Sequence, residues 1–178
     1  FAFENKLSIE EAARTLRYRL LYETAFKFYK QEHDINEAEA LNLNSRVKIA
    51  VAHNKEDNAE TVLMQLIRGS GLKGLSGIRP KRDIIIRPLL NISRAQIEAY
   101  LKKEGREFML DSTNLSEDYT RNKIRYRIIP ELERLNSSAL DNINKASEII
   151  ADTFDYLDRK VYNIVEEYML WEESGVRI

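Results

Sequence analysis

The chain has 178 residues, of which 43% are hydrophobic and 32% charged, with a formal net charge of -1 and no cysteine. These values are typical of a globular protein, exclude disulfide bonds and thiolate metal sites, and give no strong overall attraction to nucleic acid. No apolar run is long enough to span a bilayer, so we expect a cytoplasmic protein without membrane contact.

A helix and a buried strand are predicted in the first third of the chain. Ser8 and Glu11 have the spacing of a capping box, ahead of a helix over about residues 9–29. The stretch QEHDINEAEALNLNS that follows is polar and aperiodic, which indicates a connection. RVKIAVA, residues 46–52, is short, apolar and rich in β-branched side chains, and therefore predicts a buried strand.

The most glycine-rich stretch, RGSGLKGLSG, contains a G-x-G-x-x-G pattern that begins at Gly69. In a dinucleotide-binding loop such glycines follow a strand and open a helix. Here they follow NAETVLMQLIR, whose apolar residues have helical spacing up to Arg68. We therefore interpret Gly69 as a left-handed residue at the end of a helix, and the match to a nucleotide-binding loop as coincidental.

The middle of the chain alternates between strand and helix patterns. DIIIRPLL (83–90) predicts a second strand, SRAQIEAYLKKEG (93–105) a capped helix, and EFML (107–110) a third short strand. This alternation favours an α/β fold with parallel strands. Because only three short strands are visible, we expect a partial Rossmann-like parallel sheet in a mainly helical chain.

A long amphipathic helix, or two, is predicted over residues 137–173, which contain neither glycine nor proline. We interpret it as a C-terminal helical arm that packs against another domain or chain. Its apolar residues recur about every 3.5 positions: Ile143, Ile150, Phe154, Leu157, Val161, Ile164 and Tyr168.

Two carboxylates open the helix that follows the first predicted strand. Asp57 and Glu60 are three residues apart, so both project from one side of the first turn. They could hold an ammonium group or a metal ion. Alternatively, they only stabilise the helix by complementing its dipole, which contributes about 0.3 to 1 kcal/mol for each residue. Spacing alone favours this second interpretation. His53 by itself indicates no more than a structural histidine.

Two further polar clusters follow the third predicted strand. DSTN, residues 111–114, contains more capping side chains than one helix needs. In YTRNKIRYR, Arg121 and Arg125 lie one turn apart and could bind a carboxylate or phosphate in bidentate fashion. The alternative is a solvated charged face. We expect Ile124 and Ile128 to be buried on the other side of this helix and to fix the direction of the arginines.

These motifs together carry a family resemblance. AHNKEDNAETVLMQLIRGSGLKGL, IRPLL, DSTN and YTRNKIRYRIIPEL, in this order, resemble the tRNA(Ile)-lysidine synthetases of the N-type ATP pyrophosphatase (PP-loop) family, and SIEEAARTLRY fits the same pattern. The resemblance covers about residues 8–135. It implies a ligase that uses ATP to adenylate the wobble cytidine of tRNA(Ile). The ε-amine of L-lysine then forms a C–N bond and displaces AMP, pyrophosphate having left earlier.

The resemblance also implies roles for individual residues. Asp57 and Glu60 would hold the α-ammonium group of lysine, while Arg125, or Arg121, would pair with its α-carboxylate. ATP with Mg²⁺ is the implied cofactor, and no residue is assigned as a metal ligand. The reaction site would contain Arg17, His53 and Asp111, and the residues expected to contact ATP or tRNA or to order the surrounding loop are Arg14, Arg68, Ser70, Asn114 and Asn122.

The sequence departs from the family pattern in one important respect. The S-G-G-x-D-S loop that cradles the ATP phosphates in this family does not occur in the 178 residues, and Asn54 and Glu56 stand where the family often has His and Asp. We therefore expect residues 1–135 to be the second part of a catalytic domain and 136–178 to be a helical linker, inactive alone. An exposed sheet edge would favour self-association, with a homodimer as the simplest form.

Two other functions compete with this interpretation. A tRNA thiolation enzyme of the same PP-loop family would usually rely on cysteines, of which this chain has none. A non-catalytic interaction module, built around the long C-terminal helix, would tolerate alanine at Asp57 and Glu60.

Overall fold

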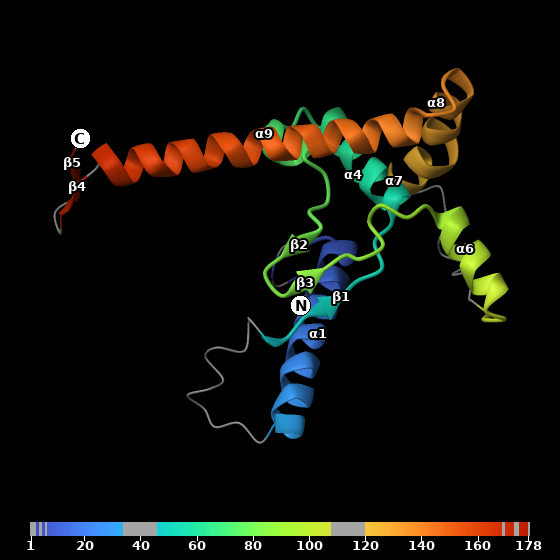
Figure 1. The fold of residues 1–178 in the computed structure, drawn as a ribbon, viewed down its shortest axis with the longest axis horizontal. Helices are drawn as coiled ribbons and strands as arrows, with labels where there is room; N and C mark the ends of the chain where they lie inside the picture. Colours follow the sequence, from blue (N-terminus) through green and yellow to red (C-terminus); the bar gives the residue numbers. More distant parts are fainter. Residues whose placement is uncertain are drawn as a thin grey trace. The chain divides into compact units, whose positions relative to one another are not determined.

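The computed structural model describes residues 3, 5, 7–33, 46–107, 120–168, 170–172 and 175–177. The chain forms two compact units. It runs from the first unit into the second, returns to the first, and ends in the second. Unit 1 comprises Phe1–Ala52 and Pro80–Pro88, and unit 2 comprises His53–Arg79 and Leu89–Ile178. Figure 1 shows the elements of each unit. No helix among the described residues has the length and apolarity needed to cross a membrane.

Unit 1 combines a long helix with a small sheet. Helix α1 spans Ile9–His33, and strands β1 (Ile49–Ala50), β2 (Lys81–Arg82) and β3 (Ile85–Ile86) form a sheet in the order β1-β3-β2. Strand β1 runs parallel to β3, which pairs antiparallel with β2. Asp83 turns the chain between β2 and β3 with a φ of 56°, a left-handed conformation that aspartate tolerates better than most residues.

The core of unit 1 lies between this sheet and α1. Val47, Ile49 and Ile84 are buried there. Side chains of α1 cover them because they recur at helical spacing on one face: Leu21, Tyr22, Ala25, Phe26 and Tyr29.

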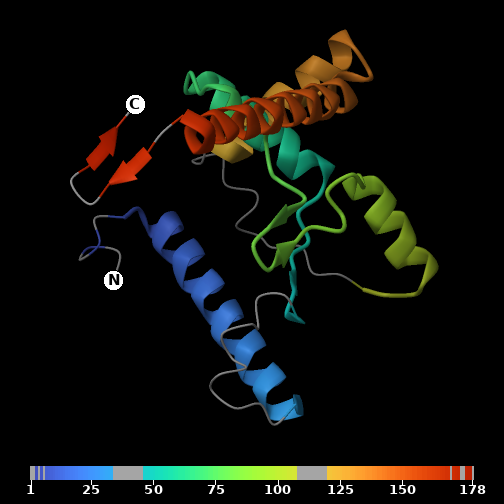
Figure 2. The ribbon, with the colours of Figure 1, turned by 60° about the vertical axis from the view of Figure 1, so that its left-hand side comes forward.

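Unit 2 is built around helix α4 (Lys55–Ile67), which contacts α5, α7, η2 and α9. In Figures 1 and 2 the long helix α9 runs alongside α4 and α5. Ala59, Ile124 and Ile129 form the buried core, with partly buried side chains of α4 and α9 around them. The remaining elements are α5 (Leu72–Leu75), α6 (Arg94–Lys103), α7 (Thr120–Lys123), the π-helical turn η2 (Ile124–Ile128), α8 (Ile129–Leu135), α9 (Ala139–Tyr168), β4 (Leu170–Glu172) and β5 (Gly175–Arg177).

The predicted starts of α1 and α6 and the predicted end of α4 are confirmed. Ser8 and Glu11 make the expected capping contacts before α1, and Ser93 forms a capping box with Gln96 before α6. Gly69, with a φ of 73°, follows α4, so the glycines of the G-x-G-x-x-G pattern do come after a helix. The loop follows the carboxyl end of α4, which presents carbonyl oxygens rather than N–H groups, and it leads only into the four-residue helix α5, so the strand-to-helix context of a dinucleotide-binding loop is missing.

A buried polar network joins α4 to the glycine-rich loop and to α9. Asn58 accepts a hydrogen bond from the backbone N–H of Ile78 at 2.6 Å. Its amide nitrogen donates to Asn144 Oδ1 at 2.8 Å and to Ser147 Oγ at 3.1 Å. Because buried polar groups need partners, this network fixes one register of α9 against α4.

The π-helical turn corrects one prediction. Ile124 and Ile128 were expected to be buried together, but Ile124 is 0% exposed, Ile129 is 6% exposed and Ile128 is 37% exposed. The Ile129 N–H bonds to the carbonyl of Ile124, five residues back, so the turn holds one extra residue and buries positions five apart. Pro130 favours this turn, since it has no N–H and its ring clashes with the carbonyl four residues earlier.

Other predictions differ from the structure at the strands and near the C-terminus. The predicted α/β class with mainly helical content is confirmed, and β1 and β3 are parallel as expected, but they are only two residues long. The third strand of the sheet is the antiparallel β2, which was not predicted. The helix expected over 137–173 ends at Tyr168, and β4 pairs with β5 with Trp171 opposite Val176. The predicted strand EFML lies mostly outside the described residues, and DSTN does entirely.

Candidate functional site

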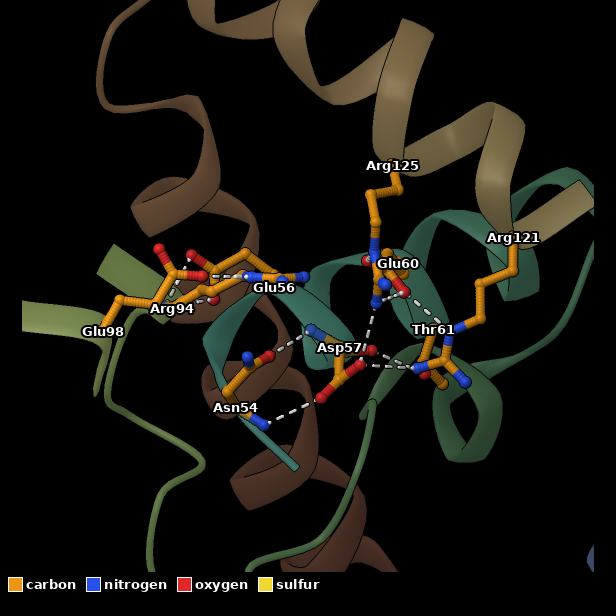
Figure 3. A network of polar contacts seen from close by, with 9 residues as sticks. All are labelled: Asn54, Glu56, Asp57, Glu60, Thr61, Arg94, Glu98, Arg121 and Arg125. Carbon is orange, nitrogen blue, oxygen red and sulfur yellow. Dashed lines mark hydrogen bonds and ion pairs between the residues drawn. The ribbon is translucent and has the colours of Figure 1, made fainter. Parts of the chain in front are cut away.

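Four charged side chains meet where α7 and η2 pack on α4, and we call them the arginine–carboxylate cluster: Asp57, Glu60, Arg121 and Arg125. Figure 3 shows both arginines reaching from their helix toward the carboxylates of α4. Glu60 Oε2 accepts hydrogen bonds from Arg121 Nε at 2.6 Å and from Arg125 Nη2 at 3.0 Å. Its other oxygen, Oε1, accepts one from Arg125 Nε at 2.5 Å. Asp57 Oδ1 accepts from the Nη2 atoms of both arginines at 3.2 Å.

The local sequence explains why these side chains converge. The two carboxylates are three residues apart on α4, and the two arginines are four apart, so each pair lies on one helix face. Ala59 and Ile124, both with no exposed surface, lie in the contact between the two helices. Ala59 and Ile124 precede Glu60 and Arg125 in the chain, so their packing in one buried cluster places the charged pairs next to each other.

Burial differs within the cluster although its charges balance. The side chain of Glu60 is 0% exposed, that of Asp57 is 18%, that of Arg125 is 21% and that of Arg121 is 29%. Two guanidinium groups offset two carboxylates, so the cluster is neutral as a whole. A fully buried carboxylate is stable only with such partners, and Glu60 has three hydrogen bonds from cations.

The environment of Arg125 keeps its guanidinium charged. Burial acts to lower the pKa of Arg125, but hydrogen bonding to Glu60 and the charges of Glu60 and Asp57 outweigh it, so the pKa is raised overall. Tyr126 contributes in the same direction. The Arg125 guanidinium therefore keeps its positive charge within the cluster.

Asp57 has two functions in the structure. Its Oδ2 accepts the backbone N–H of Asn54 at 3.0 Å, and Asn54 Oδ1 accepts the N–H of Asp57 at 3.0 Å, which completes a capping box. Its other oxygen faces the arginines. Stabilising the start of α4 and pairing with the arginines of the cluster are thus compatible.

A cavity of about 310 Å³ adjoins the cluster, since Glu60 and Arg125 contribute to its wall. This volume lies at the lower end of the range for small-molecule sites, about 300 to 1,000 Å³. On its far side, both oxygens of Glu56 accept the backbone N–H of Arg94 at 3.0 Å. The lining residues are Asn54, Glu56, Glu60, Arg94, Arg125, Tyr126 and Ile129.

The other residues predicted for the site do not join the cluster. Arg14 and Arg17 are exposed on α1, in unit 1. In unit 2, His53 is half-buried just before the N-cap of α4, Arg68 is exposed, and Ser70 donates a hydrogen bond to Gln65 at 2.6 Å. The predicted residues not yet placed are Asn122, which is buried on α7, and Asp111 and Asn114, which lie outside the described residues.

Sequence reasoning missed five of the residues that line this cavity, namely Asn54, Glu56, Arg94, Tyr126 and Ile129. Asn54 could have been found, because Asn followed three residues later by Asp is a capping pattern. Arg94 and Tyr126 carry no local signal. They reach the cavity only because α6 begins beside Glu56 and because the π-helical turn redirects the residues of η2.

Comparison with known proteins agrees with the motifs. Residues 2–132 match the PP-loop domain family. A tRNA(Ile)-lysidine synthase from Parabacteroides distasonis is 46% identical over 83% of this chain and 30% of the relative. The enzymes of the same name from Bacteroides thetaiotaomicron and Thermosipho africanus are 41% and 38% identical, over 85% and 97% of this chain and 32% and 40% of the relatives.

The chain thus spans about a third of the length of the curated relatives it matches. The resemblance found in the sequence is confirmed, because these relatives are tRNA(Ile)-lysidine synthases by name and match most of this chain. The family match itself covers well over half of the residues, and the chain therefore belongs to the PP-loop domain family.

Proposed function

We propose that this chain is part of an enzyme that ligates L-lysine to the wobble cytidine of tRNA(Ile), with ATP converted to AMP and pyrophosphate. The names of its relatives and the PP-loop match support the reaction class. The observation that carries the proposal to this chain is the arginine–carboxylate cluster beside a cavity of about 310 Å³.

The cluster suits the amino-acid end of lysine. A free amino acid carries a carboxylate and an ammonium group on one carbon, so its binding site needs both charges within a few ångströms. Arg125 and Arg121 offer guanidinium groups for the carboxylate, and Asp57 and Glu60 offer the opposite charge for the ammonium group.

Holding lysine by its α-carbon leaves the other end of the molecule for chemistry. The ε-amine needs a free lone pair to attack the adenylated C2 position of cytidine, with AMP as the leaving group. A site that clamps both α-substituents orients the side chain and lowers the entropic cost of that attack. The contribution of these residues is therefore binding and orientation.

The phosphate chemistry of ATP cannot be assigned to these residues. The S-G-G-x-D-S cradle is absent from the sequence, and the described glycine-rich loop follows α4 and leads only into the four-residue helix α5. The described residues contain no cluster of histidines and acidic side chains that could hold a metal ion. The proposal gives roles in ATP or tRNA contact to Arg14, Arg17, His53, Arg68 and Ser70.

Lysine binding tests the proposal directly. We expect the full chain to bind L-lysine in isothermal titration calorimetry and Arg125→Gln to weaken binding at least about tenfold, the effect of losing a charge-assisted hydrogen bond. Arg134→Gln is the matched control, because Arg134 is an exposed arginine of α8 that pairs with Glu131. Equal affinities for the two variants would contradict the assignment.

A further inference from the structure

Helix α4 is held on two sides near its start. The arginines of the cluster contact it through Asp57 and Glu60 on one side. Asn58 lies two positions before Glu60, which is about 200° around a helix, and its side chain bonds to α9 instead. The first turn of α4 therefore lies between the arginines of α7 and η2 and the polar side chains of α9.

Asn144 of α9 bonds to two points of this turn. Its Oδ1 accepts a hydrogen bond from Asn58 Nδ2 at 2.8 Å, and its Nδ2 donates to the backbone carbonyl of Lys55 at 3.3 Å. The same Nδ2 donates to the carbonyl of Leu140 at 2.8 Å, so the amide is also tied to its own helix. Because Lys55 and Asn58 bracket Asp57 in the sequence, these bonds fix the helical turn that carries Asp57.

The polarity of Asn144 contrasts with its neighbours along α9. Leu140 and Ile143 pack against the core of unit 2, and Ala151 is buried farther along. An apolar side chain in place of Asn144 would also be buried, but apolar contacts have no direction and would tolerate small rotations of α9. Asn144 is 9% exposed, so its desolvated amide needs its partners in one orientation. A buried asparagine can thus trade some stability for one defined register, as it does in the core of a coiled coil.

The position of Asp57 depends on this register. Its contacts with Arg121 and Arg125 are 3.2 Å long, whereas the fully buried Glu60 is held by bonds of 2.5 to 3.0 Å. Long hydrogen bonds restrain a side chain weakly. Asp57 therefore keeps its place mainly through the backbone of the first turn and the capping box with Asn54. A movement of α9 that shifted this turn would move Asp57 away from both arginines.

We propose that Asn144 is a positioning residue, which holds the first turn of α4 in the register where the arginine–carboxylate cluster can bind the amino acid. The proposal rests on the lysine-binding function proposed above. It extends that function to α9, whose side chains are not among the described residues that line the cavity. The long helix thereby takes part in substrate binding without touching the substrate.

Matched leucine substitutions test this role in the full chain. Asn144→Leu keeps nearly the same side-chain shape and removes the hydrogen bonds, so we expect it to weaken L-lysine binding at least about fivefold in calorimetry, the effect of about one hydrogen bond. Asn142→Leu is the control, because Asn142 is exposed on the same helix, and it should leave the affinity within about twofold. Asn144→Ala, which cannot overpack the site, replaces Asn144→Leu if that variant does not fold, and should show the same loss.

A stability control separates positioning from a general loosening of α9. Ala151→Gly destabilises the buried face of α9 about two turns beyond Asn144. At a temperature where the chain stays folded, lower stability alone does not change affinity, because the unfolded fraction is negligible. We therefore expect Ala151→Gly to bind lysine like the unsubstituted chain. An equal loss in Ala151→Gly, or no loss in Asn144→Leu and Asn144→Ala, would overturn the proposal.

A second measurement needs no ligand. The backbone N–H of Asp57 donates to Asn54 Oδ1 at 3.0 Å, so its nitrogen-15 NMR signal reports the geometry of the first turn. We expect Asn144→Leu to shift or broaden this signal, and Asn142→Leu and Ala151→Gly to leave it unchanged. An unchanged signal in Asn144→Leu would contradict a positioning role. If the unsubstituted chain does not bind lysine, the proposed function fails, and the Asp57 signal still decides whether Asn144 sets the register.

Discussion

At the scale of single residues, Gly77 meets two independent requirements. Its φ of 67° lies in the left-handed region, which disfavours any side chain. A Cβ atom built on it would lie 2.3 Å from Oδ1 of Asn58, the atom that accepts the Ile78 N–H. Any larger residue must therefore displace the buried network that joins α4 to α9.

We expect Gly77→Ala to lower the free energy of unfolding by more than about 1 kcal/mol, through backbone strain and loss of the Asn58 contacts. Gly71→Ala is the matched control, because Gly71 has a φ of -76° and open space around its Cβ position. Urea denaturation of the two variants measures the difference, and similar midpoints would count against this account of the loop.

The charge of Arg125 also has a consequence at this scale. Because its folded pKa is raised above the ordinary arginine value, its ionic contribution is fully present below the unfolded pKa and is lost only as the pH rises through the folded one. Both values lie far above neutrality. Any change in lysine affinity between mildly acidic and mildly basic pH must therefore come from groups other than this guanidinium.

At the scale of elements, the π-helical turn lets one helix present two sets of side chains to the same neighbours. Arg121 lies on α7 ahead of the turn and Arg125 lies near the start of the turn, and both face Asp57 and Glu60. Ile129 comes after it and is buried in the core with Ala59. Without the extra residue, the helix would turn Ile128 toward the core in place of Ile129.

Adjacent alanine substitutions test this register. We expect Ile129→Ala to cost about 2 to 5 kcal/mol of unfolding free energy, as for a buried isoleucine, and Ile128→Ala to cost less than about 1 kcal/mol. Chemical denaturation of both variants provides the comparison. The reverse order would indicate a regular α-helix over these residues.

At the scale of the whole molecule, burial is distributed unevenly along α9. Its first half packs on α4, α5 and α8, with Ile143 beside the core of unit 2. Farther along, the apolar residues stay exposed to solvent within the described part of the chain. They continue the same periodic pattern and comprise Leu157, Val161, Ile164 and Tyr168.

Alanine substitutions in the first half and in the second half of α9 should therefore differ in their effect on stability. Val161→Ala removes exposed surface only, so we expect the free energy of unfolding to change by no more than about 0.5 kcal/mol. Ile143→Ala opens a space at the core and should cost at least about 1 kcal/mol. Thermal unfolding at several concentrations measures both, and a large loss for Val161→Ala would reveal a partner surface on α9.

The sequence predicted what local chemistry determines and missed what only packing determines. Capping residues located the starts of α1 and α6, and glycine located the end of α4. The carboxylate pair and the arginine pair were each identified from helical spacing. Their contact with each other was implied only by family resemblance, because it depends on Ala59 meeting Ile124 across two helices.

The missed features share one physical origin. The hairpin of β2 and β3 depends on a left-handed Asp83, a conformation that aspartate can adopt without having to. The π-helical turn follows from Pro130 together with two isoleucines that compete for one buried position. In each case the local pattern permits two structures, and tertiary contacts select one.

The neutrality of the arginine–carboxylate cluster has a consequence for ionic strength. A neutral cluster that receives the zwitterionic end of an amino acid displaces few counterions, so dissolved salt should change lysine affinity little. Contacts between basic residues and RNA phosphates release counterions, and their affinity falls steeply as salt rises. Added salt should therefore separate the two substrates of the proposed reaction, releasing tRNA from the enzyme while lysine remains bound.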